Sequence, residues 1–498
     1  MLARLLTSLW FAASLLSSVY AEPQAVSVSD GFDLPGDVEE TEVIRFVPIE
    51  ASNTAEAQFS SSSLAANSAG SSAANSIASL ANMVASSANA VSSSASVATS
   101  SPFVPISAIS TEGTDPLQET AVKFEERKVP QDLDRPLRVG VLIGAKEAYL
   151  KYADDIIKIT ANGKSIKLSS KGQSMEMESR EFGNEDGSCI AFAADTKSLQ
   201  RACYPGTVLF RASNGKVDAI NSVDVEDYLR GVIPYEIGKL DSGRIEALKA
   251  QAVAARTYAY KHYNSREAQG FDVYADTKDQ VYKGLEGATP LTDAAVKATA
   301  GVTMMYNGEF VIAYYHSTCG GTTETLATWN RPNLPYLQSK PDRRNDGTPF
   351  CNESSYMKWE RRFADKEITD LIKRNLTESK AKLSSVATKD FKKVKEITVK
   401  NKLKSGRIQT LVVKTDKGDI EVLTDRTRWL FKKNNSILPS SFFTIKQSGK
   451  EWILTGTGFG HGVGMCQMGV RARAQAGQSY QEILTHYYPG ITLEKFDR

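Results

Sequence analysis

The distribution of apolar and polar residues changes near residue 136. Before that point apolar residues are sparse over most of the length, whereas after it short apolar runs separated by turn residues predict β-strands. The first is the continuous run LRVGVLI at residues 137–143, which is typical of a buried strand. We expect further strands at 156–159, 166–168, 207–210, 217–220, 394–399, 411–414 and 420–423.

Other stretches favour hairpins and helices. Asn214-Gly215 and Asn307-Gly308 are strong hairpin signals. An alanine-rich helix is expected to start with Asp241 or Ser242 as its N-cap and to end near Tyr263, and shorter helices are expected at 292–299 and 365–375. Together these elements predict an α+β fold with mostly antiparallel strands around one long central Ala-rich helix, with a smaller inserted α/β subdomain.

The chain is expected to divide into three parts. Residues 1–21 combine Arg4, an apolar run and small residues before Glu22, which predicts a secretory signal peptide. Residues 22–135 are acidic and then rich in Ser and Ala, so we interpret them as a disordered tether; a heptad spacing leaves a short coiled coil at 74–98 as an alternative. Residues 136–498 form the folded body, in which 353–450 is a candidate subdomain.

Charge is unevenly distributed along the chain. Residues 22–100 contain nine acids and one base, whereas residues 101–498 contain 58 bases and 49 acids. A moderately basic body suits an anionic polymer such as cell wall, and export makes nucleic acid a poor candidate partner. No later run reaches the ~20 apolar residues that a membrane span needs, so we expect the mature protein in the periplasm or cell envelope.

Five cysteines follow the expected signal peptide. In an exported chain disulfides can persist, and we expect Cys189 to pair with Cys203 and Cys319 with Cys351. Cys466 then remains as a small buried thiol. A zinc site made by His316, Cys319 and Cys351 is an alternative, but it has no fourth ligand in the sequence pattern.

Glu236 is the candidate for acid chemistry. Ile233, Pro234, Tyr235 and Ile237 surround it in a turn before the alanine-rich helix. If that turn is buried, the carboxylate is disfavoured and its pKa rises toward the range of a general acid at neutral pH. The competing interpretation is an ordinary surface glutamate before a core helix.

Two other motifs exclude familiar chemistries. The glycines between Gly456 and Gly464 lack the Gly-Lys-Ser/Thr ending and the register of a nucleotide loop, so they indicate a close backbone approach around His461. His316 and Ser317 are neighbours on an expected strand, where their side chains point to opposite faces. They therefore do not form a nucleophile and its base.

Several short blocks of the sequence, taken in their order along the chain, resemble a known family. The blocks are DVEDYLRGVIPYEI, EALKAQAVAARTYAY, DQVYKG, HSTCGGTTE, PYL, SGRI, GFGHGVGMCQMG and HYYPG. Their order resembles the SpoIID/LytB family of stage II sporulation protein D and the amidase enhancers. The resemblance covers most of residues 137–496 and leaves out the tether.

The resemblance implies a peptidoglycan lytic transglycosylase that cleaves between N-acetylmuramic acid and N-acetylglucosamine, preferring glycan stripped of its stem peptides. The catalytic acid of the family falls on Glu236. The other matching motif positions are expected to line or shape the glycan groove: Arg256, Gln280, His316, Ser317, Gly320, His461 and Gln467. The alternative from the same family is a non-catalytic glycan-binding activator of a cell-wall amidase.

No cofactor is expected. Zinc-containing relatives carry a His and two Cys before the QVY motif, whereas this chain keeps only His262 there, so we expect no metal in that loop. A hydrolase would need a second carboxylate, for which Asp276 and Asp342 are the candidates. Cys466 stands where the family usually has Ser, a nearly isosteric change.

Overall fold

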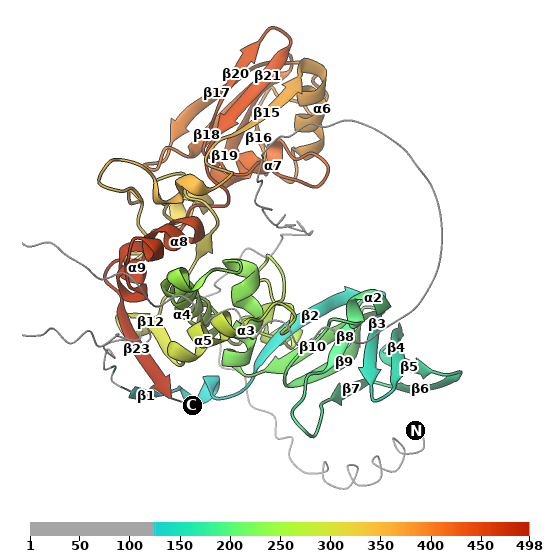
Figure 1. Ribbon diagram of the computed structural model, residues 1–498. Coiled ribbons are helices and arrows are strands. Elements are labelled where there is room, and N and C mark those ends of the chain that lie inside the picture. The colour runs from blue at the N-terminus through green and yellow to red at the C-terminus, as the bar shows by residue number, and fades with distance from the viewer. Residues whose placement is uncertain (1–123, 125, 498) are drawn as a thin grey trace, which may run out of the picture. The chain divides into compact units, whose positions relative to one another are not determined.

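The structure is a computed structural model that describes Phe124 and residues 126–497. The expected signal peptide, most of the expected tether and the coiled-coil alternative at 74–98 lie outside the described residues. The described part has a mixed α+β fold, as expected (Figure 1). The folded chain begins before residue 136, because β1 (Glu126–Lys128) pairs in parallel with the last strand, β23 (Thr492–Asp497).

Two five-stranded sheets form the first part of the fold. One has the order β11-β2-β10-β9-β7 and the other β6-β5-β4-β3-β8. The strands are β2 (Leu137–Ala145), β3 (Glu147–Tyr152), β4 (Asp155–Asn162), β5 (Ser165–Ser170), β6 (Gln173–Met177), β7 (Ser179–Phe182), β8 (Ala191–Ala193), β9 (Thr207–Ser213), β10 (Lys216–Val223) and β11 (Val273–Tyr274). β9 and β10 form the expected hairpin, in which Asn214 and Gly215 both have positive φ.

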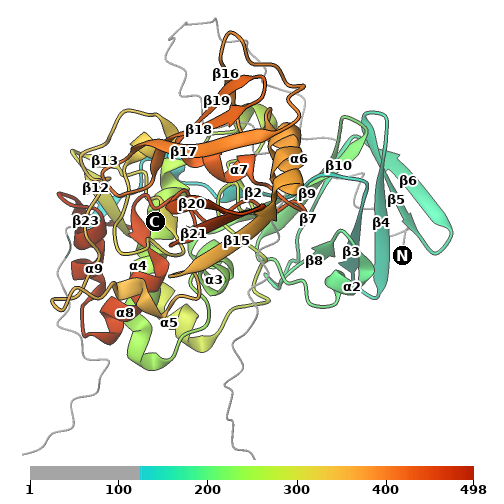
Figure 2. The ribbon, with the colours of Figure 1, turned by 90° about the horizontal axis from the view of Figure 1, so that it is seen from above.

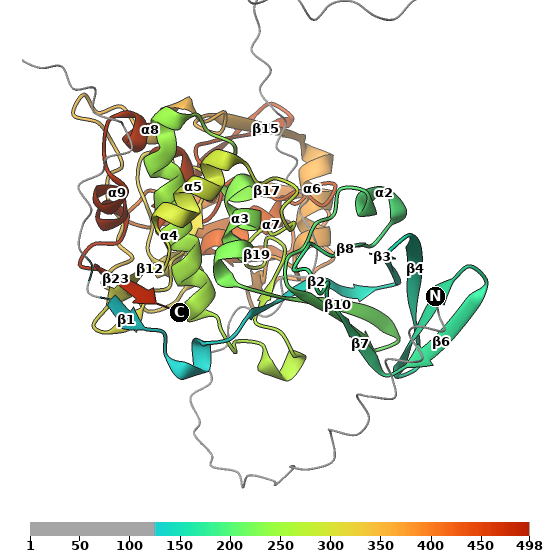
Figure 3. The same ribbon diagram turned by 60° about the horizontal axis from the view of Figure 1, so that its bottom comes forward.

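Helices α3 (Val225–Glu236), α4 (Ile245–Lys261) and α5 (Pro290–Ala298) pack against one another beside these sheets (Figure 3). In α4 every residue from Ala247 to Tyr260 is buried, and the small alanines let neighbouring helices approach. α4 begins later than expected, because Ser242–Arg244 form a separate 3-10 turn. α4 also contacts α8 (Gln467–Gln475), α9 (Tyr480–Tyr487) and β12 (Val302–Tyr306).

A four-stranded sheet of order β1-β23-β12-β13 contains the hairpin of β12 and β13 (Glu309–Phe310) that Asn307-Gly308 predicts. Nearby in sequence, β14 (Tyr315–His316) pairs in parallel with β22 (Met465–Cys466), which lies 150 residues further along the chain. The remaining short helices are α2 (Thr196–Leu199) and the 3-10 turns Gln131–Leu133, Ser242–Arg244, Glu267–Gln269, Leu326–Trp329, Phe350–Glu353 and Thr424–Arg426.

Buried residues between Trp359 and Leu454 in the sequence form a second hydrophobic core. It is built from the sheets β15-β21-β20 and β16-β19-β18-β17 with helix α6 (Figure 2), whose apolar face packs on β15 and β17. The elements are β15 (Trp359–Ala364), α6 (Asp365–Asn375), β16 (Lys382–Leu383), β17 (Val394–Lys402), β18 (Ile408–Thr415), β19 (Gly418–Leu423), α7 (Thr427–Leu430), β20 (Phe443–Ser448) and β21 (Glu451–Gly456).

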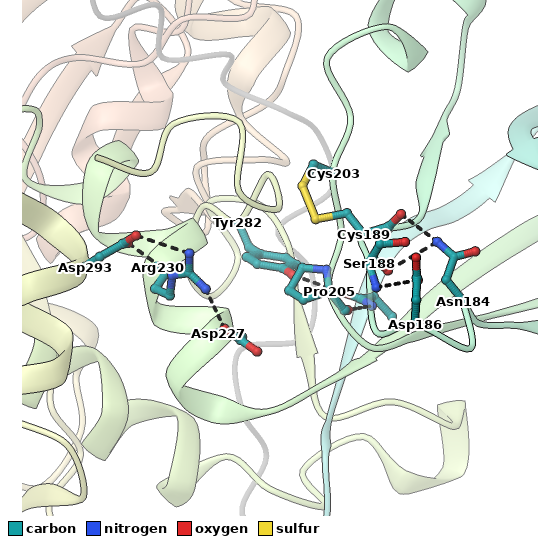
Figure 4. The surroundings of a disulfide bond; sticks show 11 residues. Asn184, Asp186, Ser188, Cys189, Cys203, Pro205, Asp227, Arg230, Tyr282 and Asp293 are labelled. Carbon is teal, nitrogen blue, oxygen red and sulfur yellow. Dashed lines mark hydrogen bonds and ion pairs between the residues drawn. A yellow bond between two sulfur atoms is a disulfide. The ribbon is translucent and has the colours of Figure 1, made fainter. Parts of the chain in front are cut away.

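The cysteines divide into one disulfide and three thiols. Cys189 and Cys203 are joined, as expected (Figure 4). Two backbone hydrogen bonds connect the neighbouring residues Ile190 and Tyr204. Cys319 and Cys351 are not joined, which corrects the pairing expected from the sequence. Both are buried, as is Cys466, and the distance from Cys319 Sγ to Cys351 Sγ is 3.5 Å.

Candidate functional site

Glu236 is the last residue of α3, where we expected a turn. Asp224 caps the start of this helix, and Pro234 lies in its final turn, where its missing N–H removes one backbone hydrogen bond close to the helix end. Gly231 lets the helix approach the loop at Gly284, because a Cβ at residue 231 would lie 2.5 Å from the Gly284 carbonyl oxygen. The carbonyl end of a helix dipole disfavours a negative charge, so the position itself favours the protonated acid.

The surroundings of the Glu236 carboxyl group set its chemistry. Burial raises its pKa to about 7, against the opposing effect of hydrogen bonds that favour the carboxylate. The Val281 amide donates to Oε1 at 2.8 Å and Gln467 Nε2 donates to Oε2 at 3.2 Å. Residue 236 as a whole keeps some exposed surface. A group with this pKa is populated in both protonation states at neutral pH.

Tyr315 and Gln280 extend the hydrogen-bond network of this carboxyl group. Tyr315 hydrogen-bonds to Glu236 and accepts from Gln280 Nε2 at 2.9 Å. The Gln280 side chain is fully buried, and its Oε1 accepts from the Tyr228 hydroxyl at 3.1 Å. Gln280 therefore orients Tyr315 and has no exposed surface that a ligand could contact.

The pairing of β14 with β22 brings distant motifs to Glu236. Tyr315 lies opposite Met465 and His316 opposite Cys466, so Gln467 emerges at the start of α8 beside the acid. Gly464, with φ of +70°, permits this approach, because a Cβ there would lie 2.0 Å from the Tyr314 carbonyl oxygen. The glycine run is thus the close backbone approach that the sequence indicates.

The two predicted histidines are neutral neighbours with ring centres 5.5 Å apart. Burial, assisted by nearby positive charges, lowers the pKa of His461 to about 3 and that of His316 well below its usual value. The His461 ring accepts at Nδ1 from the Val463 amide, so its proton is on Nε2. His461 is partly exposed and packs against Trp329, with ring centres 4.9 Å apart.

The remaining predicted residues occupy two different settings. Ser317 and Gly320 lie in the loop after β14: the Ser317 carbonyl accepts from Met468, and Gly320 packs against Thr457. Arg256 lies elsewhere, fully buried, with both carboxylate oxygens of Glu226 at 2.7 and 2.6 Å. Glu226 lies in the first turn of the helix that Glu236 ends, so Arg256 holds α3 in place and has no exposed surface toward a groove.

Three contributors were missed by the sequence interpretation. Tyr315 and Val281 contact Glu236 directly, and Trp329 packs on His461. Tyr315 and Val281 each stand next to a predicted residue, His316 and Gln280, and this adjacency is the signal that could have identified them. Trp329 carried no such signal.

Both candidates for a second carboxylate are bound by groups other than Glu236. Asp342 is fully buried and is bound by Arg473 and Tyr487. Asp276 accepts a hydrogen bond from the Lys278 amide in its own turn. Burial is the first cause of the raised pKa of Glu236, and no acidic residue is among the causes.

Comparisons with known proteins agree with the motif pattern. A family described as Stage II sporulation protein matches residues 213–306, and a domain of unknown function matches residues 350–464. An uncharacterized protein of Brachyspira hyodysenteriae (strain ATCC 49526 / WA1) is 30% identical over 370 residues, which cover 74% of this chain and 92% of that protein.

Two relatives from Bacillus subtilis (strain 168) carry descriptive names. Its amidase enhancer is 32% identical over 295 residues, covering 54% of this chain and 40% of the enhancer. Its stage II sporulation protein D is 27% identical over 304 residues, covering 58% of this chain and 79% of the relative. Within the described residues, no helix combines the length and apolar character needed to span a membrane.

Proposed function

Because this chain belongs to the SpoIID/LytB family, we propose that it is an exported lytic transglycosylase of peptidoglycan. Its substrate would be glycan strands, most readily those stripped of stem peptides, cut between N-acetylmuramic acid and N-acetylglucosamine. The observation that carries this proposal is a single enclosed carboxyl group with a pKa of about 7 where three motif segments meet.

In the proposed reaction Glu236 acts twice. Its protonated form donates a proton to the glycosidic oxygen, and the bond from that oxygen to the muramyl C1 breaks as positive charge develops at C1. The resulting carboxylate accepts the proton of the muramyl C6 hydroxyl, whose oxygen bonds to C1 and closes the anhydro ring. No water is consumed, so one carboxyl group serves both steps.

The groups around Glu236 support this cycle. The Val281 amide and Gln467 stabilise the carboxylate between the two proton transfers. The partly exposed rings of Trp329 and His461 offer a flat surface of the kind that binds sugar faces. We also propose that the buried alanine-rich helix α4 is the central support of the site, since it contacts both α3 and α8.

The test uses purified protein and peptide-free glycan strands, with mass spectrometry of the products. We expect new ends that carry anhydro-muramic acid. Glu236→Gln should lower the rate by about 10²- to 10⁴-fold with the circular dichroism spectrum unchanged. Glu309→Gln, on an exposed strand, is the matched control and should cleave normally. Reducing muramic acid ends in place of anhydro ends would rule the mechanism out.

The second candidate function is a non-catalytic activator of a cell-wall amidase, which the similarity to the amidase enhancer favours. In that case Glu236→Gln should keep both glycan binding and stimulation of the amidase. A sedimentation assay with glycan and an amidase assay with and without the variant separate the two functions. Loss of stimulation in the variant would count against a purely binding role.

A further inference from the structure

Four potential metal ligands converge outside the Glu236 network. They are Cys319 after β14, Asp342, Cys351 in the 3-10 turn Phe350–Glu353, and Cys466 at the end of β22. All four side chains are fully buried, and their ligand atoms lie within 4.8 Å of one another. Cys466 is thus brought from a distant part of the sequence to three ligands that lie between residues 319 and 351.

The spacing of these atoms suits coordination better than a disulfide. Cys319 Sγ lies 3.5 Å from Cys351 Sγ and 3.3 Å from Asp342 Oδ2. Tetrahedral zinc bound by thiolates at ~2.3 Å places sulfur atoms ~3.8 Å apart, whereas a disulfide needs ~2.05 Å.

The groups around the cluster are donors that suit thiolate and carboxylate ligands. Backbone amides of Gly321 and Gly469 donate to the sulfurs of Cys319 and Cys466 at 3.2 and 3.4 Å. The Asp342 carboxylate is oriented by Arg473 at 2.8 Å on Oδ1 and by Tyr487 at 2.9 Å on Oδ2. Such outer partners fix the ligands of metal sites in position.

We propose that Cys319, Asp342, Cys351 and Cys466 bind one zinc ion in a closed structural site. Sulfur-rich, four-ligand and buried sites of this kind favour Zn²⁺. Binding releases the thiol protons to solvent, and Arg473 offsets part of the excess negative charge. The site departs from the expectation of no metal. His316, a ligand in the alternative considered from the sequence, is outside it and bonds to the Val463 carbonyl.

The site has a consequence for Glu236 that rests on the proposed function. Cys466 caps α8, and the next residue, Gln467, donates to Glu236. A metal bound at Cys466 therefore fixes the hydrogen-bond donor of the catalytic acid. Metal content can be measured without any glycan, so failure of the metal site and failure of the proposed function are distinguishable.

The first experiment measures metal and thiols in the full chain purified without chelators. We expect about one zinc per chain by elemental analysis and three thiols after denaturation with a chelator. Cys466→Ser should lose the zinc, whereas the control variant Cys189→Ser/Cys203→Ser should keep it. A zinc-free chain with one thiol would indicate a Cys319–Cys351 disulfide and overturn the proposal.

A second measurement remains decisive if Cys466→Ser does not fold. Co²⁺ added to the reduced, metal-depleted wild-type chain should give a thiolate-to-cobalt charge-transfer band, and Asp342→Asn should change the accompanying ligand-field bands. Zn²⁺ should abolish the cobalt spectrum and raise the melting temperature. Absence of the charge-transfer band and of any Zn²⁺-dependent shift in melting temperature would overturn the proposal.

Discussion

At the scale of single residues, Glu236 is held between opposing influences. Burial favours its neutral form, whereas the Val281 amide and the Gln467 side chain favour its carboxylate, and the pKa of about 7 reflects this balance. The Gln467 contribution comes from a side chain, so one substitution can remove it.

The Gln467 donor should set the upper pH limit of activity. Loss of its hydrogen bond in Gln467→Met destabilises the carboxylate by ~1.5 kcal/mol, which raises the pKa of Glu236 by about one unit. We expect the wild-type rate to fall as pH rises through about 7, and the variant's rate to fall about one unit higher. A pH profile of kcat/KM checks this. An unchanged midpoint would show that Gln467 does not act on the acid.

Glu236 should also make stability depend on pH. Its folded pKa of about 7 lies above the ordinary value of 4.5, so its favourable contribution is complete below 4.5 and is lost as pH rises through 7. The loss is of the order of 3 kcal/mol. Glu236→Gln should therefore raise the melting temperature at pH 8 and change it little at pH 4.5. Equal shifts at both pH values would contradict the assignment of the pKa to this residue.

The burial of Glu236 could be predicted from the sequence, but its surroundings could not. Apolar neighbours of Glu236 predict burial, and burial is the dominant cause of its raised pKa. Tyr315 and the Val281 amide reach it from segments whose relation to α3 is set by tertiary packing. For the same reason the convergence of Cys466 and Asp342 with two other cysteines could not be predicted, since no local pattern connects them.

At the scale of elements, the short parallel pair of β14 and β22 joins the histidine motif to the glycine-rich motif. Strand periodicity could not predict it, because each strand has only two residues. α3 was missed for a different reason: Gly231 and Pro234 suggest a turn, but Gly231 serves packing and Pro234 lies in the last helical turn. The hairpins at Asn214 and Asn307 were predicted because their turns are locally determined.

Gly464→Ala should break the pairing of β14 with β22. The new Cβ would lie 2.0 Å from the Tyr314 carbonyl oxygen, in a residue with φ of +70°. We expect a loss of more than ~3 kcal/mol in the free energy of unfolding, together with loss of glycan cleavage. Gly477→Ala, with φ of +82° and nothing within 4 Å of its Cβ, is the control and should cost only ~1–2 kcal/mol. If urea denaturation gave equal losses of unfolding free energy for both variants, backbone strain rather than the contact with the Tyr314 carbonyl would explain the effect of Gly464→Ala.

At the scale of the whole described chain, Arg407 links the second core to the loop beside the site. It is fully buried beside β18, and its guanidinium donates to the carbonyls of Cys319 and Thr322 at 2.8 and 3.1 Å. Its charge also contributes to the low pKa of His461. The Arg407 guanidinium therefore connects the second hydrophobic core to the loop of the first core that contains Cys319 and Thr322.

Arg407→Ala should cost about 2 to 6 kcal/mol, because the Cys319 and Thr322 carbonyl groups lose a donor at about 1 to 3 kcal/mol each. We also expect a rise in the pKa of His461, since one neighbouring positive charge is removed. Denaturant unfolding measures the first effect and NMR titration of the imidazole the second. Arg361→Ala on the exposed face of β15 is the control and should stay within about 0.5 kcal/mol of the wild type. A similar change in both variants would argue against a linking role.

The order β1-β23-β12-β13 has a genetic consequence. The final strand lies inside its sheet, between the first described strand and β12, although it comes last in the sequence. A premature stop codon just before Thr492 would remove β23, which would separate β1 from β12 and leave both without a partner on that side. Truncations that delete β23 should therefore be poorly tolerated.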